Sequence, residues 1–291
     1  MSNRNKNSKL LNRVQILSQA LPYIQKFHGK IFVIKYGGSA MENQILKKET
    51  IKDFVLLSCV GIKLILVHGG GPEINQMSKR LKLPVKFVNG LRVTNKETME
   101  IVEMVLVGKL QKDLVNLLNV SGAKSIGLCG KDGKLFSAKQ AKSMKKYGFI
   151  GQVDKIDSNI YMILIEKGYI PVISSVGADE KGQNYNINAD NVAASIAQEI
   201  KATKLILMTD INGILKNPRQ NDSLISKISV KEVNKLINNK VILGGMIPKV
   251  KAAIDAICGG VKATQIINGG IKHSILLEVF TDEGIGTMIT A

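Results

Sequence analysis

The chain has little of the chemistry that marks several common protein classes. Its 291 residues include no tryptophan, only 3 cysteines and 4% aromatic residues. Cys59, Cys129 and Cys258 are too far apart for a disulfide framework or a CxxC metal site, which favours a reducing compartment. No uncharged apolar run reaches the roughly 18 residues that a membrane-spanning helix needs. We therefore expect neither a disulfide-stabilised secreted domain nor a membrane protein.

Arginine is also scarce, although the chain is strongly basic. Lysine and arginine total 41 against 23 acidic residues, a formal net charge of +18. The only arginines are Arg4, Arg13, Arg80, Arg92 and Arg219. Because nucleic-acid readers rely on arginine and aromatic side chains, the charge has two interpretations. One is drift toward lysine in an AT-rich genome, with a few lysines binding small anions; the other is a polyanionic partner. The even spread of lysines favours the first, so we expect no nucleic-acid partner.

The order of apolar segments predicts one α/β domain over residues 1–291. A hydrophobic content of 45% excludes disorder as the main state. Short β-branched runs alternate with helical patterns, which is typical of a mainly parallel sheet covered by helices on both faces. The expected strands are 31–35, 64–67, 125–128, 170–174, 205–208 and 264–267, and the expected helices are 95–119, 157–167, 190–200, 231–239 and 247–258. Residues 134–153 alternate polar and apolar positions and predict a β-hairpin.

A basic segment, residues 1–29, precedes the first expected strand. Its first nine residues are polar and are expected to be disordered. A helix that ends at Gly29 is predicted next, because one apolar stripe has helical spacing. The stripe consists of Leu10, Val14, Leu17, Leu21 and Ile24. No acidic residue occurs before Glu42. This helix either packs on its own domain or serves as an oligomerisation arm, and the sequence leaves both open.

Clusters of glycine and polar residues stand where expected strands end or expected helices begin. Ligands of open α/β sheets bind beyond the carboxyl ends of the strands. Four clusters occupy such positions: KYGGS at 35–39, GGGP at 69–72, NINAD at 186–190 and GGMIPK at 244–249. Glycines let backbone N–H groups approach an anion, and helix N-termini attract it. Neither a Walker A sequence nor a GxGxxG motif after a strand is present, which disfavours the common P-loop and dinucleotide-binding folds.

Each cluster also has an ordinary structural interpretation. The glycines can simply form turns, Asp190 can be an N-cap, and Lys249 can be solvated. Two glycine loops, two lysines and an aspartate together nevertheless favour phosphoryl transfer, because that reaction needs charge neutralisation and in-line positioning rather than covalent catalysis. His68 is expected to support a turn, and the three cysteines are expected to be small core residues.

The motifs resemble those of acetylglutamate kinases, a branch of the amino-acid kinase family. The resemblance covers about residues 10–291 and rests on KYGGSAM at 35–41, VHGGGP at 67–72, GLRVT at 90–94, NINAD at 186–190 and GGMIPK at 244–249. GLRVT together with NINAD separates this branch from aspartokinase, carbamate kinase and UMP kinase. The resemblance implies a three-layer α/β/α sandwich with a mainly parallel central sheet. It also implies that residues of about 30–180 bind the acyl amino acid and residues of about 181–291 bind the nucleotide.

The implied reaction is the phosphorylation of the side-chain carboxylate of N-acetyl-L-glutamate by ATP. The product, N-acetyl-L-glutamyl 5-phosphate, belongs to the second step of arginine biosynthesis. By resemblance, Lys35 and Lys249 stabilise the transferring phosphoryl group and Asp190 holds both lysines, which makes these three the catalytic residues. Mg²⁺ is expected to arrive with ATP, since no carboxylate cage for a metal is visible.

The remaining site residues are likewise implied by the resemblance. Backbone N–H groups that bind phosphate are expected at Gly37, Gly38 and Gly70. Acetylglutamate is expected to contact Gly70, Gly71, Arg92 and Asn186. Arg92 suits the α-carboxylate of that substrate, because a guanidinium binds a carboxylate through two parallel hydrogen bonds.

Regulation and location are also implied. Arginine-inhibited members of the family carry an N-terminal helix that interlaces dimers into a homohexamer, a trimer of dimers, and they bind arginine beside it. Tyr23, Lys216, Glu278 and Gly284 match that arginine site, whereas Gln265 stands where the pattern usually has histidine. Photosynthetic relatives bind the nitrogen-signalling PII protein. A composition rich in lysine, isoleucine and asparagine suits a plastid gene, so we expect the plastid stroma, with the cytoplasm as the alternative, and PII as a partner.

Two rival functions stay open at this point. The chain can be another kinase of the same family that acts on aspartate, glutamate, carbamate or UMP. It can also be a regulatory protein that uses its charge to bind a polyanion. The second alternative leaves the five motifs unexplained.

Overall fold

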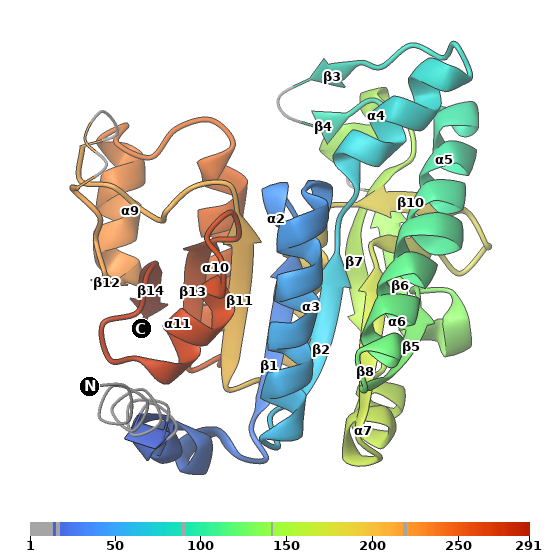
Figure 1. The fold of residues 1–291 in the computed structure, drawn as a ribbon. Coiled ribbons are helices and arrows are strands. Elements are labelled where there is room, and N and C mark those ends of the chain that lie inside the picture. The colour runs from blue at the N-terminus through green and yellow to red at the C-terminus, as the bar shows by residue number, and fades with distance from the viewer. Residues whose placement is uncertain (1–13, 16–17, 89–90, 141, 218–219, 221) are drawn as a thin grey trace.

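The computed structural model describes residues 14–15, 18–88, 91–140, 142–217, 220 and 222–291 (Figure 1). Of the expected N-terminal helix, residues 14–15 and 18–27 are helical. The expected disordered tail, and Leu10 and Leu17 of the apolar stripe, lie outside the described residues. In Figure 1 the helix at 18–27 lies below α11 (Ser274–Phe280).

An eight-stranded sheet forms the centre of the molecule. Its order is β12-β14-β13-β11-β1-β2-β8-β5, and every neighbouring pair is parallel except β13 with β14. The strands are β1 (Ile31–Tyr36), β2 (Lys63–His68), β5 (Lys124–Leu128), β8 (Tyr169–Ser174), β11 (Lys204–Thr209), β12 (Lys227–Ser229), β13 (Ala263–Asn268) and β14 (Thr287–Thr290). The predicted mainly parallel sheet is therefore confirmed.

Helices cover both faces of this sheet (Figure 1). One face carries α7 (Ser158–Glu166), α8 (Ala189–Glu199), α9 (Val230–Asn238) and α10 (Met246–Cys258). The other carries α3 (Gln44–Cys59), α6 (Gln111–Val120) and α11. Neighbouring strand residues alternate between two hydrophobic cores, because successive side chains point to opposite faces. Val33 and Ile65 lie in the first core, and Ile34 and Leu66 in the second. The three-layer sandwich is thus confirmed.

The predicted hairpin is also present and belongs to a second small sheet. Strands β6 (Phe136–Gln140) and β7 (Ile150–Ile156) pair antiparallel. Together with β9 (Val176–Ala178) and β10 (Asn184–Ile187) they close into a four-stranded barrel. A separate two-stranded hairpin is formed by β3 (Phe87–Val88) and β4 (Leu91–Arg92). These additions place β4 and β10 above the carboxyl end of the central sheet (Figure 1).

The helix expected at 95–119 differs from a regular α-helix. It consists of α5 (Lys96–Glu103), a π-helical segment η1 (Met104–Leu110) and α6. Leu106 and Leu110 of η1 are buried and pack on Gly70, whose missing side chain leaves room for them. Wider π-helical turns are frequent at functional sites. Within the described ranges, no helix combines the length and apolar character needed to cross a bilayer.

Candidate active site

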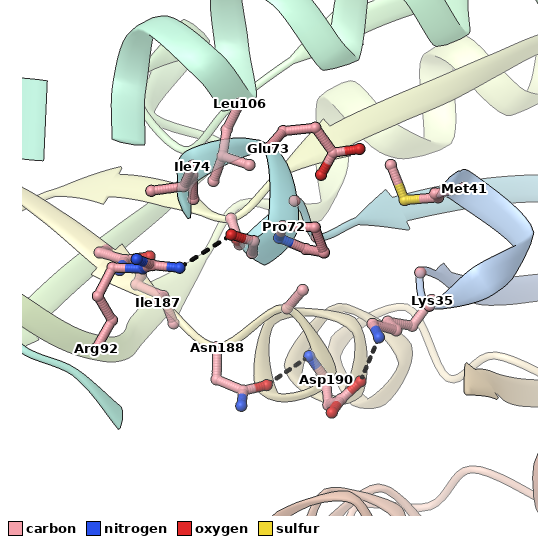
Figure 2. A pocket seen from close by; sticks show the side chains of 18 of the residues that line it. Lys35, Met41, Pro72, Glu73, Ile74, Arg92, Leu106, Ile187, Asn188 and Asp190 are labelled. Carbon is pink, nitrogen blue, oxygen red and sulfur yellow. Dashed lines mark hydrogen bonds and ion pairs between the residues drawn. The ribbon is translucent and has the colours of Figure 1, made fainter. Parts of the chain in front are cut away.

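A cavity of about 380 Å³ opens at the carboxyl ends of β1 and β2 (Figure 2). It contains every residue that the sequence assigned to catalysis, phosphate binding and substrate binding. Those residues are Lys35, Gly37, Gly38, Gly70, Gly71, Arg92, Asn186, Asp190 and Lys249. Parallel strands bring their carboxyl ends to one edge of the sheet, so loops that are distant in sequence meet there.

Two glycine loops shape the floor of this cavity. Gly38 has a φ of +72°, and a side chain there would approach within 2.4 Å of the Asp210 carboxylate. The backbone N–H of Ser39 donates to that carboxylate, because α2 (Ser39–Glu42) begins at this point. The second loop runs into α4 (Gly71–Arg80), with Pro72 in its first turn. Both loops therefore present backbone N–H groups at helix N-termini, where an anion is stabilised.

Asp190 connects the two lysines predicted to be catalytic. The Nζ atom of Lys35 lies 3.2 Å from Asp190 Oδ1, and Lys249 Nζ donates to Asp190 Oδ2 at 2.9 Å. Burial acts to raise the pKa of the Asp190 carboxyl, but the charges of Lys35 and Lys249 outweigh it and hold that pKa below its usual value. Burial lowers the pKa of Lys35, and the charge of Asp190 opposes this. The Asp190 carboxylate thus holds the ammonium groups of Lys35 and Lys249 beside the two glycine loops.

The ordinary interpretations of Asp190 and Lys249 do not apply. The N-cap of α8 is Asn188, whose side chain accepts from the backbone N–H of Asp190 at 2.8 Å. Asp190 therefore lies inside the first turn, and its side chain is free to reach the cavity (Figure 2). Lys249 lies in the first turn of α10 with its side chain mostly buried in an ion pair. Neither residue is simply a helix cap or a solvated surface group.

The opposite wall of the cavity carries Arg92 and Asn186. Arg92 is 8% exposed, and its Nη2 donates to the carbonyl of Gly71 at 3.0 Å. Its guanidinium carbon also lies 4.7 Å from the ring centroid of Phe87. Burial lowers the pKa of Arg92, yet a guanidinium remains charged at neutral pH. Asn186 extends from β10 beside it, so a cation and an amide face the same space.

The sequence prediction missed Asp210. It lines the cavity, accepts the Ser39 N–H and also acts to raise the pKa of Lys35. The signal was available, because Asp210 directly follows β11 at the edge where ligands bind. The sequence prediction also gave no binding role to the apolar lining of the cavity, because an apolar residue that lines a site looks like any other core residue. This lining includes Met41, Ile74, Phe87, Leu106, Ile150 and Ile187.

A second cavity of about 500 Å³ begins at Asp210 and continues toward α10. Its lining is mostly apolar and comes from the loop after β11, from the residues that precede and begin α10, and from the end of β13: Ile211, Asn212, Gly213, Ile214, Leu215, Val241, Ile242, Leu243, Met246 and Asn268. Because both cavities share Asp210, a ligand with a charged end and an apolar end can occupy the two together.

Three of the four predicted arginine-site residues, Tyr23, Glu278 and Gly284, do not line the first cavity. The Tyr23 hydroxyl is hydrogen-bonded to Asp282, which raises the pKa of Tyr23. Glu278 Oε2 accepts from the backbone N–H of Ile285 at 2.9 Å. Gly284 has a φ of +61° and a side chain there would meet Glu278. Tyr23, Glu278 and Gly284 therefore lie on adjoining segments.

Lys216 and Gln265 are the two other positions compared with the predicted arginine site. Lys216 lies in the loop after β11, where its backbone N–H donates to Ser223. Lys204 is the lysine whose charge interacts with Glu278, and its Nζ lies 4.9 Å from the Phe27 ring centroid. Burial lowers the pKa of Lys204 to about 8. Gln265 is buried in β13, with its Oε1 lacking a hydrogen-bond partner within the described part of the chain.

The predictions for cysteine were partly wrong. Cys129 is buried as expected, but Cys59 and Cys258 are exposed. Each of these two is the last residue of its helix, where the chain leaves the core. His68 is fully buried and its Nδ1 contacts the Gly69 carbonyl at 2.9 Å, in agreement with a turn-supporting role. In the described ranges, no three histidine, cysteine or acidic side chains gather as a metal site.

Comparison with known proteins shows the family to which the chain belongs. The family model of the amino acid kinase family matches residues 30–268. The chain is 52% identical over 278 residues to "Acetylglutamate kinase, chloroplastic" of Arabidopsis thaliana, covering 96% of this chain and 80% of that protein. It is 53% identical over 277 residues to the acetylglutamate kinase of Trichormus variabilis, covering 95% and 93%.

A solved structure of N-acetylglutamate synthase from Neisseria gonorrhoeae, complexed with coenzyme A and N-acetyl-glutamate, shares the fold with a TM-score of 0.84 and 26% identity. It covers 96% of this chain, while the chain spans 63% of that synthase. The sheet, the paired glycine loops and these matches lead to one conclusion: the chain belongs to the amino acid kinase family, and it is a kinase.

Proposed function

We propose that the chain transfers the γ-phosphoryl group of ATP to the side-chain carboxylate of N-acetyl-L-glutamate. The observation that carries this proposal is Asp190, which holds Lys35 and Lys249 beside the glycine loops at 3.2 and 2.9 Å. Phosphoryl donor and acceptor are both anions, so the reaction needs fixed cations between them. The acceptor carboxylate is already ionised at neutral pH, and the reaction needs no general base.

The proposed substrate positions follow from the two walls of the cavity. Arg92 would bind the α-carboxylate of acetylglutamate, with Gly70, Gly71 and Asn186 completing that wall. Gly37, Gly38 and Gly70 would donate backbone N–H groups to the phosphates. The buried leucine and isoleucine side chains around Gly70 offer an apolar surface for the acetyl group.

ATP, with its own Mg²⁺, would occupy the other wall and the second cavity. The apolar lining contributed by Leu215, Ile242 and Met246 suits a purine ring. The shared Asp210 then marks the junction between the phosphates and the nucleoside. Apart from Asn186 on the acetylglutamate wall and Gly37, Gly38 and Gly70 beside the phosphates, this assignment gives residues of about 30–180 to the acyl amino acid and residues of about 181–291 to the nucleotide. Mg²⁺ enters bound to the phosphates, as is usual for kinases.

A coupled assay of ADP release tests the reaction. ADP formation should require N-acetyl-L-glutamate, whereas aspartate, glutamate, carbamate and UMP should each support far less. A preference for one of these four would reassign the substrate within the family. Salt-sensitive binding of a nucleic acid without any ADP formation would instead support the polyanion-binding alternative.

We further propose that arginine inhibits the enzyme at the site formed by Tyr23, Glu278 and Gly284. Glu278 supplies a carboxylate for a guanidinium, and the charge of Lys204 interacts with that carboxylate. Lys216 stays a predicted member of this site. The helix at 18–27 adjoins this site and is the proposed element that interlaces dimers into a hexamer. A rate that does not change at millimolar arginine would remove the proposal of arginine inhibition. A dimeric mass in solution would remove the proposal of a hexamer.

PII binding and a plastid location remain proposals that rest on composition and on relatives. The word "chloroplastic" in the name of the Arabidopsis thaliana protein applies to that protein. A pull-down with PII, in the presence and absence of ATP, tests the partner. Recovery of no kinase under either condition would count against it.

A further inference from the structure

A buried hydroxyl connects the two residues proposed to hold the acyl amino acid. Thr94 is completely buried, with a relative exposure of 0%. Its Oγ1 donates to the carbonyl of Arg92 at 2.9 Å. The same Oγ1 accepts from Nδ2 of Asn186 at 3.3 Å. One hydroxyl behind the cavity therefore contacts both Arg92, on the β3–β4 hairpin, and Asn186, on the barrel strand β10.

The direction of these hydrogen bonds fixes how Asn186 is oriented. A threonine hydroxyl has one hydrogen to donate and two lone pairs that can accept. Because the hydrogen is directed at the Arg92 carbonyl, only the lone pairs remain for Asn186. The side-chain amide must therefore turn its NH₂ group toward Thr94, which leaves Oδ1 and one N–H for other partners. Without the hydroxyl, this hydrogen bond would no longer select one of the two orientations of the amide.

Hydrogen bonds also fix the backbone on both sides of Thr94. Thr94 N–H donates to the Tyr147 carbonyl at 2.9 Å, and its own carbonyl accepts from Phe149 N–H at 2.7 Å. The Phe149 carbonyl in turn accepts from Asn186 N–H at 2.9 Å. A side chain at Gly148 would lie only 2.1 Å from the Thr94 carbonyl oxygen, so glycine is required there. The segment 147–149 thus locks Thr94 and Asn186 into one unit.

We propose that Thr94 is a positioning residue that sets the orientation of Arg92 and Asn186 toward the acyl amino acid. It acts through these two residues and does not itself reach the reacting atoms. The inference rests on the proposed function, since it concerns how the acetylglutamate wall is organised. It predicts a defect in acetylglutamate binding, with phosphoryl transfer itself and ATP binding preserved, because the lysines and the nucleotide cavity are contacted by other residues.

The central experiment compares variants of nearly equal size in the full-length enzyme. Thr94→Val removes the hydroxyl, and we expect the KM for acetylglutamate to rise about five- to tenfold, the effect of one lost hydrogen-bond network. The KM for ATP and kcat should stay within about twofold. Thr94→Ser keeps the hydroxyl and should restore the wild-type KM. Thr264→Val is the matched control, because Thr264 is also fully buried but lies in β13.

A double-mutant cycle tests whether the effect passes through Asn186. In an Asn186→Ala background, adding Thr94→Val should raise the KM for acetylglutamate by a much smaller factor than in the wild type. Equal factors in both backgrounds would overturn this part of the proposal. Isothermal titration calorimetry with N-acetyl-L-glutamate alone provides the same comparison without turnover.

The remaining outcomes separate this inference from the proposed function. Should Thr94→Val not fold, Thr94→Ser and Thr94→Cys decide: a higher KM for the cysteine variant supports the proposal, and equal values overturn it. An unchanged acetylglutamate KM in Thr94→Val, or equal increases for acetylglutamate and ATP, also overturns it. If the wild-type enzyme itself makes no acetylglutamate-dependent ADP, the proposed function fails instead.

Discussion

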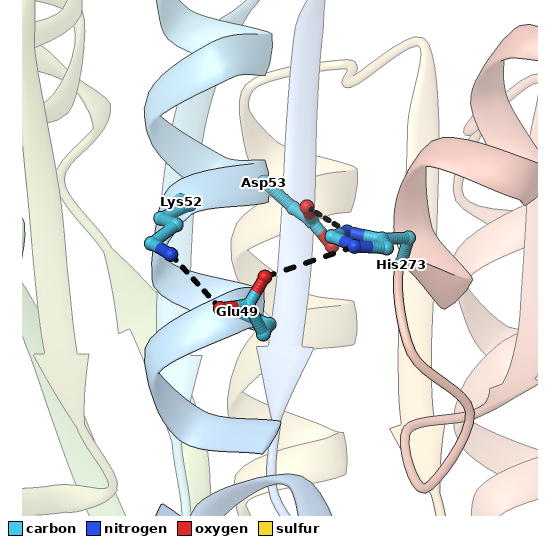
Figure 3. Close-up of polar contacts among 4 residues, drawn as sticks. All are labelled: Glu49, Lys52, Asp53 and His273. Carbon is cyan, nitrogen blue, oxygen red and sulfur yellow. Dashed lines mark hydrogen bonds and ion pairs between the residues drawn. The ribbon is translucent and has the colours of Figure 1, made fainter. Parts of the chain in front are cut away.

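Nδ1 of His273 lies 2.8 Å from Oδ1 of Asp53, and this contact joins α3 to the residue that precedes α11 (Figure 3). Asp53 is 2% exposed, and its second oxygen lacks a hydrogen-bond partner within the described part of the chain. Burial raises the pKa of Asp53, while the hydrogen bond from His273 acts to lower it. Glu49 lies farther away, with its Oε2 3.7 Å from His273 Nε2. His273 is therefore the main partner of a buried carboxyl.

Removing that partner should destabilise the fold. We expect His273→Ala to lower the free energy of unfolding by about 1–3 kcal/mol, because a buried acceptor loses its donor. Adding Asp53→Asn should recover part of the loss, since a neutral amide is less costly to bury than a carboxylate. Urea unfolding at neutral pH measures both effects, with Lys272→Ala as the exposed neighbouring control. Equal unfolding midpoints for His273→Ala and wild type would contradict this assignment.

The contact between Asp53 and His273 could not be predicted from the sequence. The two residues are 220 positions apart, and neither belongs to a local pattern. By contrast, Lys35, Gly70 and Asp190 each lie at the end of a strand or at the start of a helix. Parallel strands place all such positions at one edge, so their meeting could be predicted without knowing the order of the strands.

Other features could not be predicted because they depend on packing at one position. A helical pattern over residues 95–119 does not reveal a π-helical turn, since the apolar spacing stays close to that of an α-helix. The π-helical turn is explained by the packing of Leu106 against Gly70. Cys59 was expected in the core on the basis of its apolar neighbours, but it is exposed at the end of α3. An apolar context does not show on which face of a helix end a residue lies.

The close contact between Gly38 and Asp210 predicts that the first glycine loop tolerates no side chain. A Cβ at position 38 would lie 2.4 Å from Asp210 Oδ1, and the φ of +72° is unfavourable for alanine. Gly38→Ala should therefore reduce kcat/KM for ATP by at least tenfold while the protein stays folded. Gly108→Ala is the control, because a side chain at this exposed helical position meets nothing within 4 Å. Equal ATP kinetics for the two variants would show that the Asp210 side chain moves aside to make room for the alanine.

His68 predicts a loss of stability in mild acid. Burial lowers its pKa from 6.5 to about 4, so the unfolded chain takes up a proton at a pH at which the folded chain does not. The stabilising contribution is complete above pH 6.5 and is lost as the pH falls toward 4. A shift of this size corresponds to about 3 kcal/mol. His68→Asn should show a flatter decrease in unfolding free energy between these pH values, measured by urea titration. Parallel curves for the variant and wild type would contradict the prediction.

Lys35 and Lys249 contact different oxygens of Asp190, at 3.2 and 2.9 Å, so each can be tested separately. Replacing either by methionine keeps most of the side-chain volume and removes one cation from the transferring phosphoryl group. We expect each change to lower kcat by about 10²–10³, or about 2.7–4 kcal/mol, by analogy with the loss of one oxyanion-stabilising donor. Lys251→Met, an exposed lysine on the same helix as Lys249, should turn over normally.

Asp190 makes the two lysine effects interdependent. Asp190→Asn leaves both cations without their carboxylate, and burial then lowers the pKa of Lys35 with only the smaller effect of the Asp210 charge to oppose it. The rate of Asp190→Asn should therefore fall at least as far as that of either lysine variant, and adding Lys35→Met to it should cost much less than it does in the wild type. The measurement is acetylglutamate-dependent ADP release across pH 6–9, with thermal unfolding as the check that each variant is folded. A fully additive set of losses would show that Asp190 does not act through the lysines.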